Sequence, residues 1–464
     1  MQMLKIWRTN QRYREVLAVY LPLVMGMSAV TVMEFTDRVF LSNYSLEAIS
    51  AATPASGMAF VFLVLFGGVG NYCGVFIAQY VGAGQLDRIG AMLCQGIYFT
   101  LISGIILLFI ALFLAEPIYT LAGHTPEIRK LEILYFPILC GGGVFYVADQ
   151  TLSSFFSGRG LTRPVMIVNI IGMLINIPLD YALIYGWSFF PELGIAGAGI
   201  ATITSSGSIT LILILLILTH KHEDRFKIKS NRRFEFDLFK RLLRYGVPGS
   251  MQLCLDILAF VIFIMLIGRL GIAELAATNI ALSISAIAFM PSYGTSQGIG
   301  VLVGQSLGRK QPQQGRYATV SAIHLLLLYI LIVDLLFIFC PQIIVDIFVP
   351  EDMAADNYRP VIEKAVTIMR IMACYLLLDA LYMAFAGALK GAGDTRYLMF
   401  AILGASIFCF LLPLYIGIEI FEMGVYFAWG CVLNFVFSLF LLTGFRYRQG
   451  KWQSMSVIKE DEKI

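Results

Sequence analysis

Four aspartates lie inside long apolar stretches of the sequence, where a charged side chain is unusual. Asp37 occurs in "MEFTDRVFL", Asp256 in "LCLDILAF" and Asp379 in "YLLLDALYMAF". Asp180 occurs in "NIPLDYALI", and Asn176 precedes it by one turn on the same helix face. An ionised side chain at the centre of a bilayer costs about 3 kcal/mol or more, so it is expected to face a cavity or a partner. We therefore expect these five residues to handle an ion or a substrate.

Such carboxyl groups are suited to exchanging a proton or binding a small cation. A carboxyl group sheltered from water can take up or release a proton near physiological pH. When it is ionised and lies near Asn or backbone oxygens, it is also a hard oxygen site for Na⁺. The residues leave both ions open, and they leave open whether a Na⁺ site forms at Asp37 and Asp180 or at Asp256 and Asp379.

The composition indicates that helices in a membrane must position these side chains. Of the 464 residues, 59% are hydrophobic and 14% are charged, and the mean hydropathy is +0.81. A soluble domain carries roughly 25% charged residues. Apolar runs of about 20 residues, the length that crosses a bilayer as a helix, recur without the alternation of a membrane barrel. The sequence predicts an all-α integral membrane protein with twelve transmembrane helices, at 16–41, 50–81, 92–115, 131–155, 165–185, 195–218, 243–268, 279–307, 318–340, 365–389, 398–418 and 425–445.

The two halves of the chain resemble each other. A constant offset pairs Pro22 with Pro248, Gly74 with Gly300 and Gln79 with Gln305. Further along, "SGRGLTR" at 157–163 matches "KGAGDTR" at 390–396 at a slightly larger offset. Each half therefore forms a six-helix unit, and because six is even, the two units are parallel repeats related by an axis along the membrane normal.

The charge distribution predicts the lobes and the orientation. We expect a first lobe at 1–218, a cytoplasmic linker at 219–244, a second lobe at 245–446 and a cytoplasmic tail at 447–464. Most of the 33 Lys and Arg residues fall in one set of loops, which the positive-inside rule places in the cytoplasm together with both termini. The net charge of +3 reflects this bias and gives no reason to expect nucleic acid. We expect the chain to be a monomer in the cytoplasmic (inner) membrane.

Two further features occur once in each half of the chain, a Gly-Gln segment and a proline, and both are interpreted as structural. The segments "IAQYVGAGQ" and "LVGQSLGRKQ" predict one tight turn built twice, with Gln79, Gly82, Gln305 and Gly308 in structural roles. Pro22 and Pro248 lie in the helices that open each repeat. A proline inside a helix removes one hydrogen bond and bends the helix, and the bend could serve either as a moving part or as a fixed kink.

The sequence gives little support for an enzyme. It has no Walker loop and no catalytic or zinc-binding pattern in the helices. The eight cysteines occur singly, mostly in apolar segments, so we expect no metal or redox pair. No cofactor is expected apart from Na⁺ or H⁺ as the coupling ion.

In the order and spacing of several motifs, the chain resembles the multidrug and toxic compound extrusion (MATE) family, in particular its NorM-like branch. These motifs are "FTDRVFL", "IAQYVGAGQ", "GRGLTRP", "NIPLD", "VPGSMQLCLD", "ELAATNIA", "VGQSLGRKQ" and "DALYMAFAGALKGAGDT". The resemblance runs from the first predicted helix to the last. It implies two six-helix bundles arranged as a V around a central cavity. It also implies export of drug-like cationic or amphipathic compounds through alternating access, in exchange for Na⁺ or H⁺.

The resemblance also assigns roles to the acidic residues. Asp37, Asn176 and Asp180 match positions of the amino-terminal lobe that are implicated in cation binding. Asp256 and Asp379 match acidic positions of the carboxy-terminal lobe in the NorM-like branch. The first of these positions is usually Glu in that branch, so Asp256 has a shorter reach.

Two other functions remain as alternatives. A flippase for lipid-linked sugars or peptidoglycan precursors, from the same superfamily, would need a cavity lined by several Arg or Lys residues, for which Arg370 is the main candidate inside a helix. A receptor or scaffold would not explain a duplicated bundle with acidic residues inside each half.

Overall fold

The computed structural model describes residues 13–122, 125–187, 190–219, 225–228, 230–346 and 355–459. The two chain ends that we expect in the cytoplasm, 1–12 and 460–464, lie outside these residues, as do parts of the predicted linker and of the loop at 347–354. The prediction that both termini are cytoplasmic therefore has no counterpart in the structure.

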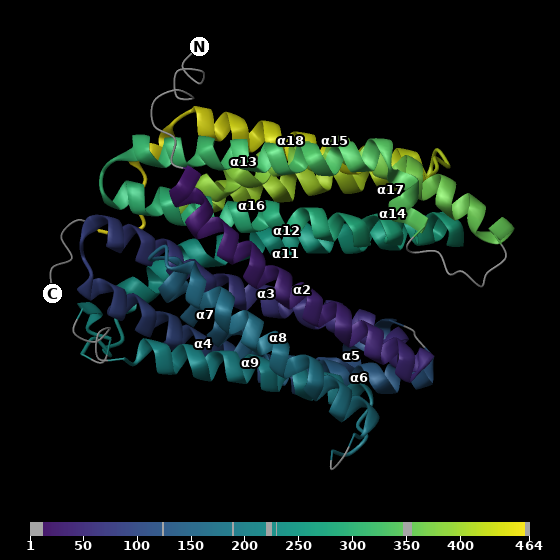
Figure 1. Cartoon of the computed structure of the whole chain (residues 1–464), viewed down its shortest axis with the longest axis horizontal. Coiled ribbons are helices and arrows are strands. Elements are labelled where there is room, and N and C mark those ends of the chain that lie inside the picture. The colour runs from purple at the N-terminus through teal and green to yellow at the C-terminus, as the bar shows by residue number, and fades with distance from the viewer. Residues whose placement is uncertain are drawn as a thin grey trace. The chain divides into compact units, whose positions relative to one another are not determined.

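Helices make up almost all of the described chain, and no strand occurs in it (Figure 1). Eleven segments of the described chain, each a single helix or a run of joined helices, are long and apolar enough to span a membrane. A bent helix at residues 272–308 brings the described spans to twelve. The prediction of an all-α membrane protein is confirmed. The spans are α2 (Tyr13–Tyr44), α3 (Leu46–Ala83), α4 (Asp87–Phe113), α6 (Pro126–Gly141) with α7 (Gly143–Ser157), α8 (Thr162–Tyr185), α9 (Ile195–Ile217), α11 (Phe236–Leu270), α12 (Ile272–Gly308), α13 (Pro312–Phe339), α15 (Ala355–Ala392), α16 (Thr395–Gly404) with η1 (Ala405–Leu411) and α17 (Leu412–Glu419), and α18 (Val425–Arg448).

Three short helices were not predicted. Two of them, α5 (Ala115–Ala122) and α14 (Pro341–Asp346), follow α4 and α13, the corresponding helices of the two repeats. The third, η2 (Lys451–Ser454), lies in the predicted tail, where the side chain of Trp452 is buried.

The bend in α12 has a physical cause that the sequence analysis missed. The helix turns by 42° between Ala286 and Ala288. Pro291 follows four positions after this point, and a proline cannot donate to the carbonyl group four residues before it. Pro22 and Pro248 also lie inside helices, α2 and α11, which continue through them. That these two prolines bend their helices remains a prediction.

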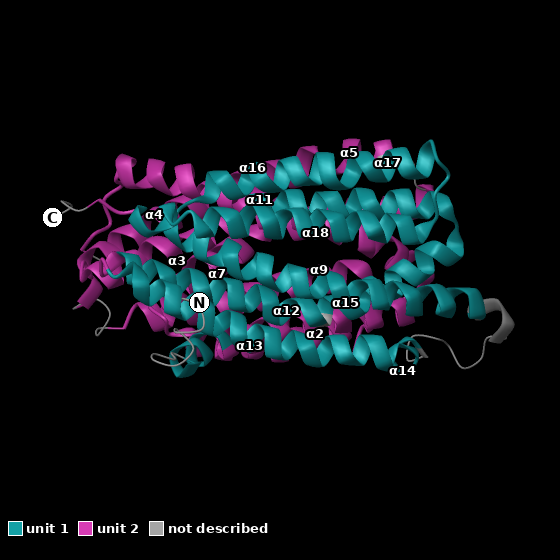
Figure 2. Cartoon of the chain, turned by 90° about the horizontal axis from the view of Figure 1, so that it is seen from above, with its two compact units in different colours: residues 1–20, 252–307, 311–455 teal, residues 21–251, 308–310, 456–464 magenta. Residues whose placement is uncertain are grey.

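The chain forms two compact units, coloured separately in Figure 2. Unit 2 holds residues 21–251 and 308–310 and the tail from Ser456, whereas unit 1 holds 252–307, 311–455 and the residues up to Tyr20. Within unit 2, α3 packs against α6 and α7, and α8 packs against α9; within unit 1, α15 packs against α13 and α18. Each unit has its own hydrophobic core.

The repeat predicted from sequence recurs in the backbone geometry. In unit 2, a Cβ atom added to Gly158 would lie 2.6 Å from the carbonyl oxygen of Gly74; in unit 1, a Cβ atom added to Gly391 would collide with the carbonyl oxygen of Gly300. The turns that follow are also alike, because Gly160 and Gly393 both have positive φ, 78° and 99°. Each repeat thus closes the same helix pair with glycines at corresponding positions.

Part of the predicted linker at 219–244 is packed onto unit 2. α11 begins at Phe236, inside this segment, and the residues before it lie against α4. Nε2 of Gln95 donates to the carbonyl oxygen of Arg233 at 3.1 Å, and Arg88 forms two hydrogen bonds with the Glu235 carboxylate, at 3.1 and 2.8 Å. The linker thus supplies hydrogen-bond partners for two buried polar side chains of α4, Arg88 and Gln95.

Candidate functional site

Two predicted acidic residues meet in the interior of unit 2. Asp37 lies in the last two turns of α2, and Asp180 lies in α8, where their carboxyl groups are neighbours. Asp180 is fully buried, and Asp37 is 9% exposed. Asn176 lies one turn before Asp180 on the same helix and is also fully buried. The structure therefore brings together the three residues that the sequence analysis grouped in this half.

The polar atoms of this cluster have few partners. Oγ1 of Thr202, from α9, approaches Oδ2 of Asp37 at 3.4 Å. Oδ1 of Asp37, both carboxyl oxygens of Asp180 and both amide atoms of Asn176 have no hydrogen-bond partner among the described residues. Buried polar atoms are nearly always satisfied in folded proteins, so this concentration of unsatisfied atoms indicates a place for something that binds.

The chemistry of the donor set fits a proton or a small hard cation. Two adjacent buried carboxylates repel each other unless they share a proton or a cation lies between them. Carboxylate, amide and hydroxyl oxygens are the ligands that hard cations prefer. No group of three or more His, Cys, Asp or Glu side chains able to hold a metal ion occurs in the described part of the chain. A Na⁺ ion at this place would therefore need the oxygens of Asn176 or Thr202 in addition to the two carboxylates.

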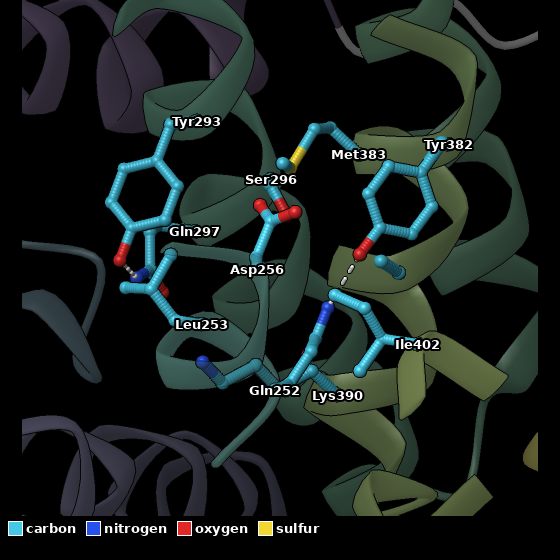
Figure 3. A pocket seen from close by; sticks show the side chains of 11 residues that line it. Gln252, Leu253, Asp256, Tyr293, Ser296, Gln297, Tyr382, Met383, Lys390 and Ile402 are labelled. Carbon is cyan, nitrogen blue, oxygen red and sulfur yellow. Dashed lines mark hydrogen bonds between the residues drawn. The ribbon is translucent and has the colours of Figure 1, made fainter. Parts of the chain in front are cut away.

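A second polar site lies in unit 1, where α11, α12, α15 and α16 line a pocket (Figure 3). Asp256 points into this pocket between Tyr293 and Tyr382. Nε2 of Gln252, one turn before Asp256, donates to the hydroxyl group of Tyr382 at 2.9 Å. This bond joins two of the polar side chains that line the pocket with Asp256.

Asp379 stands behind the pocket rather than in its lining. It is 4% exposed, and its Oδ2 atom has no hydrogen-bond partner. Asp256 and Asp379 are close enough for each charge to act on the other. Lys390, in the last turn of α15, also lines the pocket, although the sequence analysis placed it in a cytoplasmic loop. The pocket in unit 1 thus contains a basic group together with Asp256.

The Gly-Gln segments occupy the last turns of α3 and α12, as expected from their sequence. Oε1 of Gln79 accepts a hydrogen bond from the backbone N–H of Val457 at 2.9 Å, which holds the tail against unit 2. Gly308 lies against the carbonyl group of Gln79 so closely that no Cβ atom would fit. Gly82 and Gln305 lie within the same two helix ends. None of the four reaches the acidic clusters, and their structural role remains a prediction.

Several polar residues near the acids were missed by sequence reasoning. Gln252, Tyr293, Gln297 and Tyr382 line the pocket of unit 1, and Thr202 contacts Asp37. A signal existed for Gln252, which is one turn before Asp256 in the same way that Asn176 is one turn before Asp180. For the others, the sequence alone gives no indication of which helix faces meet.

Comparisons with known proteins agree with this architecture. The family model MatE matches residues 22–182 and 248–416, one match in each half. The multidrug resistance protein MdtK of Proteus mirabilis is 28% identical over 394 residues, covering 83% of each chain. The multidrug resistance protein PmpM of Pseudomonas aeruginosa is 28% identical and covers 86% of this chain and 82% of its own. A probable multidrug resistance protein NorM of Mannheimia succiniciproducens is 27% identical and covers 88% and 86%.

Solved structures show the same fold at lower identity. A transporter of the MOP superfamily from Pyrococcus furiosus superposes with a TM-score of 0.85 at 18% identity, covering 97% of this chain and 98% of that one. A crystal structure of a MATE protein in the bent conformation also gives 0.85 at 18% identity, with 97% of each chain covered. With a family model matched in both halves and relatives aligned over most of their length, the chain belongs to the MatE family of membrane transporters.

Proposed function

We propose that the chain is a secondary active exporter of drug-like cationic or amphipathic compounds, driven by antiport with Na⁺ or H⁺ through alternating access. The support from comparison is that relatives covering more than four fifths of the chain are named multidrug resistance proteins. The support from the residues is two buried acidic sites, one in each unit.

The observation that carries the proposal is the pair Asp37 and Asp180. Their carboxyl groups are adjacent, lie inside membrane-spanning helices and have three oxygens without a hydrogen-bond partner. A cation bound here would contact α2 and α8 together and so favour the arrangement in which these helices are close. The shift between conformations can be no larger than the difference in cation affinity between them.

The coupling ion is part of the proposal. Asp37 and Asp180 provide one candidate site, and Asp256 with Asp379 provides the other. The proposal includes Na⁺ at either pair, and the pair in unit 1 is the one that matches the NorM-like branch. Efflux of ethidium from proteoliposomes, measured under a Na⁺ gradient and under a pH gradient separately, tests the proposal. Efflux driven by one gradient and absent without either is expected; efflux that ignores both would contradict antiport.

A flippase for pyrophosphate-linked lipids is less well supported. Among the residues that line the pocket of unit 1, the only basic side chain is Lys390, and Asp256 shares the pocket with it. A pyrophosphate carries several negative charges and would need a cluster of Arg or Lys residues.

We further propose that the chain acts as a monomer, without a cofactor and without nucleic acid, in the cytoplasmic membrane with both termini in the cytoplasm. The bias of Lys and Arg towards one set of loops supports this orientation. Labelling of cysteines introduced into the tail, in intact cells and in permeabilised cells, would test it.

A further inference from the structure

Unit 2 contains another carboxylate inside a membrane span, and the site described above does not use it. Asp149 lies in α7, within the span Pro126–Ser157. Its Oδ1 atom accepts a hydrogen bond from Oγ of Ser153, one turn later, at 3.0 Å. No Lys or Arg forms an ion pair with it among the described residues. An intramembrane carboxylate without a cationic partner is by default a candidate for binding a ligand.

Asp149 belongs to a polar face of its helix. Helical spacing places four side chains along one side of α7, and each is partly accessible: Tyr146, Asp149, Gln150 and Ser153. The opposite side of the helix packs into the core of unit 2, where Val147, Thr151 and Ser154 are buried. Because acyl chains cannot solvate a carboxylate, a polar face that remains accessible inside a membrane span is expected to line a water-filled path.

In the internal repeat, this face of α7 corresponds to a part of α15 that lines the pocket of unit 1. The offset that pairs Gly158 with Gly391 also pairs Asp149 with Tyr382, and Tyr146 with Asp379. Neither α7 nor α15 is interrupted between these residues, so the offset applies throughout. In unit 1 an aspartate precedes a tyrosine by three positions, whereas in unit 2 the tyrosine precedes the aspartate. The two repeats thus use the same pair of side chains in exchanged order.

Other pocket positions of unit 1 correspond to small or polar residues of unit 2. Tyr293 corresponds to Gly67, where an added Cβ atom would lie 2.5 Å from Cε1 of Tyr146 and 3.3 Å from Cγ of Gln150, so the Tyr146 ring packs directly against this glycine. Lys390 corresponds to Ser157. The counterpart face in unit 2 therefore replaces a tyrosine by a glycine that the Tyr146 ring covers, and a basic group by a hydroxyl, so that Asp149 has no basic residue at the position of Lys390.

We propose that Asp149, with the ring of Tyr146, binds the positively charged end of the exported compound, a lipophilic organic cation. This inference rests on the proposed function and assigns its substrate site. Asp180 is fully buried and Asp37 nearly so, which suits a small ion, whereas Asp149 is partly accessible, which suits a large ligand. An aromatic ring beside a carboxylate adds a cation–π contact to the ion pair.

The test is ethidium binding to the purified full chain in detergent, followed by fluorescence anisotropy. We expect Asp149→Asn to weaken binding about tenfold or more, and Asp149→Glu, which keeps the charge, to recover most of it. The matched control is Asp334→Asn on α13, another carboxylate inside a membrane span, which should bind ethidium as the parent chain does. Melting temperatures of all variants show that each is folded.

The outcomes separate this inference from the proposed function. If the parent chain transports ethidium under an ion gradient and Asp149→Asn binds and transports it equally well, the substrate site is wrong and the function stands. Equal weakening by Asp334→Asn and Asp149→Asn would also overturn the assignment, because it would reflect a general effect of lost charge. If the parent chain shows no gradient-driven transport but binds ethidium through Asp149, the proposed function fails and the site remains.

Discussion

Asp37 on α2 and Asp180 on α8 lie side by side within unit 2, although several membrane spans separate them in the chain. No hydrogen bond from Lys or Arg to either carboxyl group occurs among the described residues, although the charge of Arg38, the next residue in the chain, acts on Asp37. Repulsion between the two adjacent buried carboxylates therefore destabilises the packing of the helices that carry them, unless a proton or a cation is taken up. Such an arrangement links the packing of two helices to the occupancy of one small site.

Removing one of the two acids should relieve the repulsion between them. We predict that Asp180→Asn raises the melting temperature of the purified protein in the absence of coupling ion by about 2–4 °C, which corresponds to roughly 1 kcal/mol. The same substitution should abolish the rise in melting temperature that a bound ion produces in the parent chain. Thermal unfolding in NaCl and in choline chloride at constant pH measures both effects. A variant that is no more stable and still responds to Na⁺ would argue against a shared site.

The glycine contacts of the two repeats make a matched prediction. A methyl group at Gly158 or at Gly391 would press on the backbone of Gly74 or Gly300. We expect Gly158→Ala and Gly391→Ala each to lower stability by about 1–3 kcal/mol, because the helix pair must separate. Gly430→Ala is the control, since nothing lies within 4 Å of its added Cβ atom, and it should stabilise α18 by up to about 1 kcal/mol. Equal changes in stability at the three positions would show that helix propensity, and not close packing, determines the effect of an added methyl group.

Most of the fold could be predicted from the sequence because a bilayer restricts the possibilities. Twelve apolar runs of sufficient length allow few structures other than helices, and the pairing of Gly74 with Gly300 indicated the duplication. The beginning of α11 was missed because "FDLFKRLLR" is amphipathic and charged, which resembles a solvated linker, whereas the structure continues the helix through it. The bend of α12 near Pro291 was not predicted, because Pro291 pairs with Leu65 and has no proline counterpart in the other repeat.

The docked linker allows a test of its own. Arg88 is buried on α4 and forms two hydrogen bonds with Glu235, whose side chain is 37% exposed. We predict that Glu235→Gln lowers stability by about 1–3 kcal/mol, because it removes the carboxylate charge that accepts two hydrogen bonds from a buried guanidinium group. Glu363→Gln breaks the exposed pair with Arg359 and should change stability by less than about 0.5 kcal/mol. Chemical unfolding of the two variants beside the parent chain compares them; losses of equal size would mean that the buried pair does not hold the linker.

The candidate site was predicted less completely than the fold. Asp37 and Asp180 could be predicted because a carboxylate in an apolar run is costly wherever it lies. Asn176 could be predicted because it lies one turn before Asp180 on the same helix face. Their meeting depends on how α2, α8 and α9 pack, which no local pattern encodes. Lys390 was assigned to a loop because it directly follows the predicted helix at 365–389, and Asp149, inside the predicted helix at 131–155, was not among the predicted site residues.

Transport by the Asp37→Asn variant tests the central claim most directly. The variant keeps the shape of the side chain and removes its charge, so it should insert, fold and bind ethidium like the parent chain. In proteoliposomes with the ion gradient that drives the parent chain, we predict that ethidium flux falls at least about tenfold, towards the rate without a gradient. Flux through folded Asp37→Asn protein that equals the flux through the parent chain under the same gradient would contradict the account.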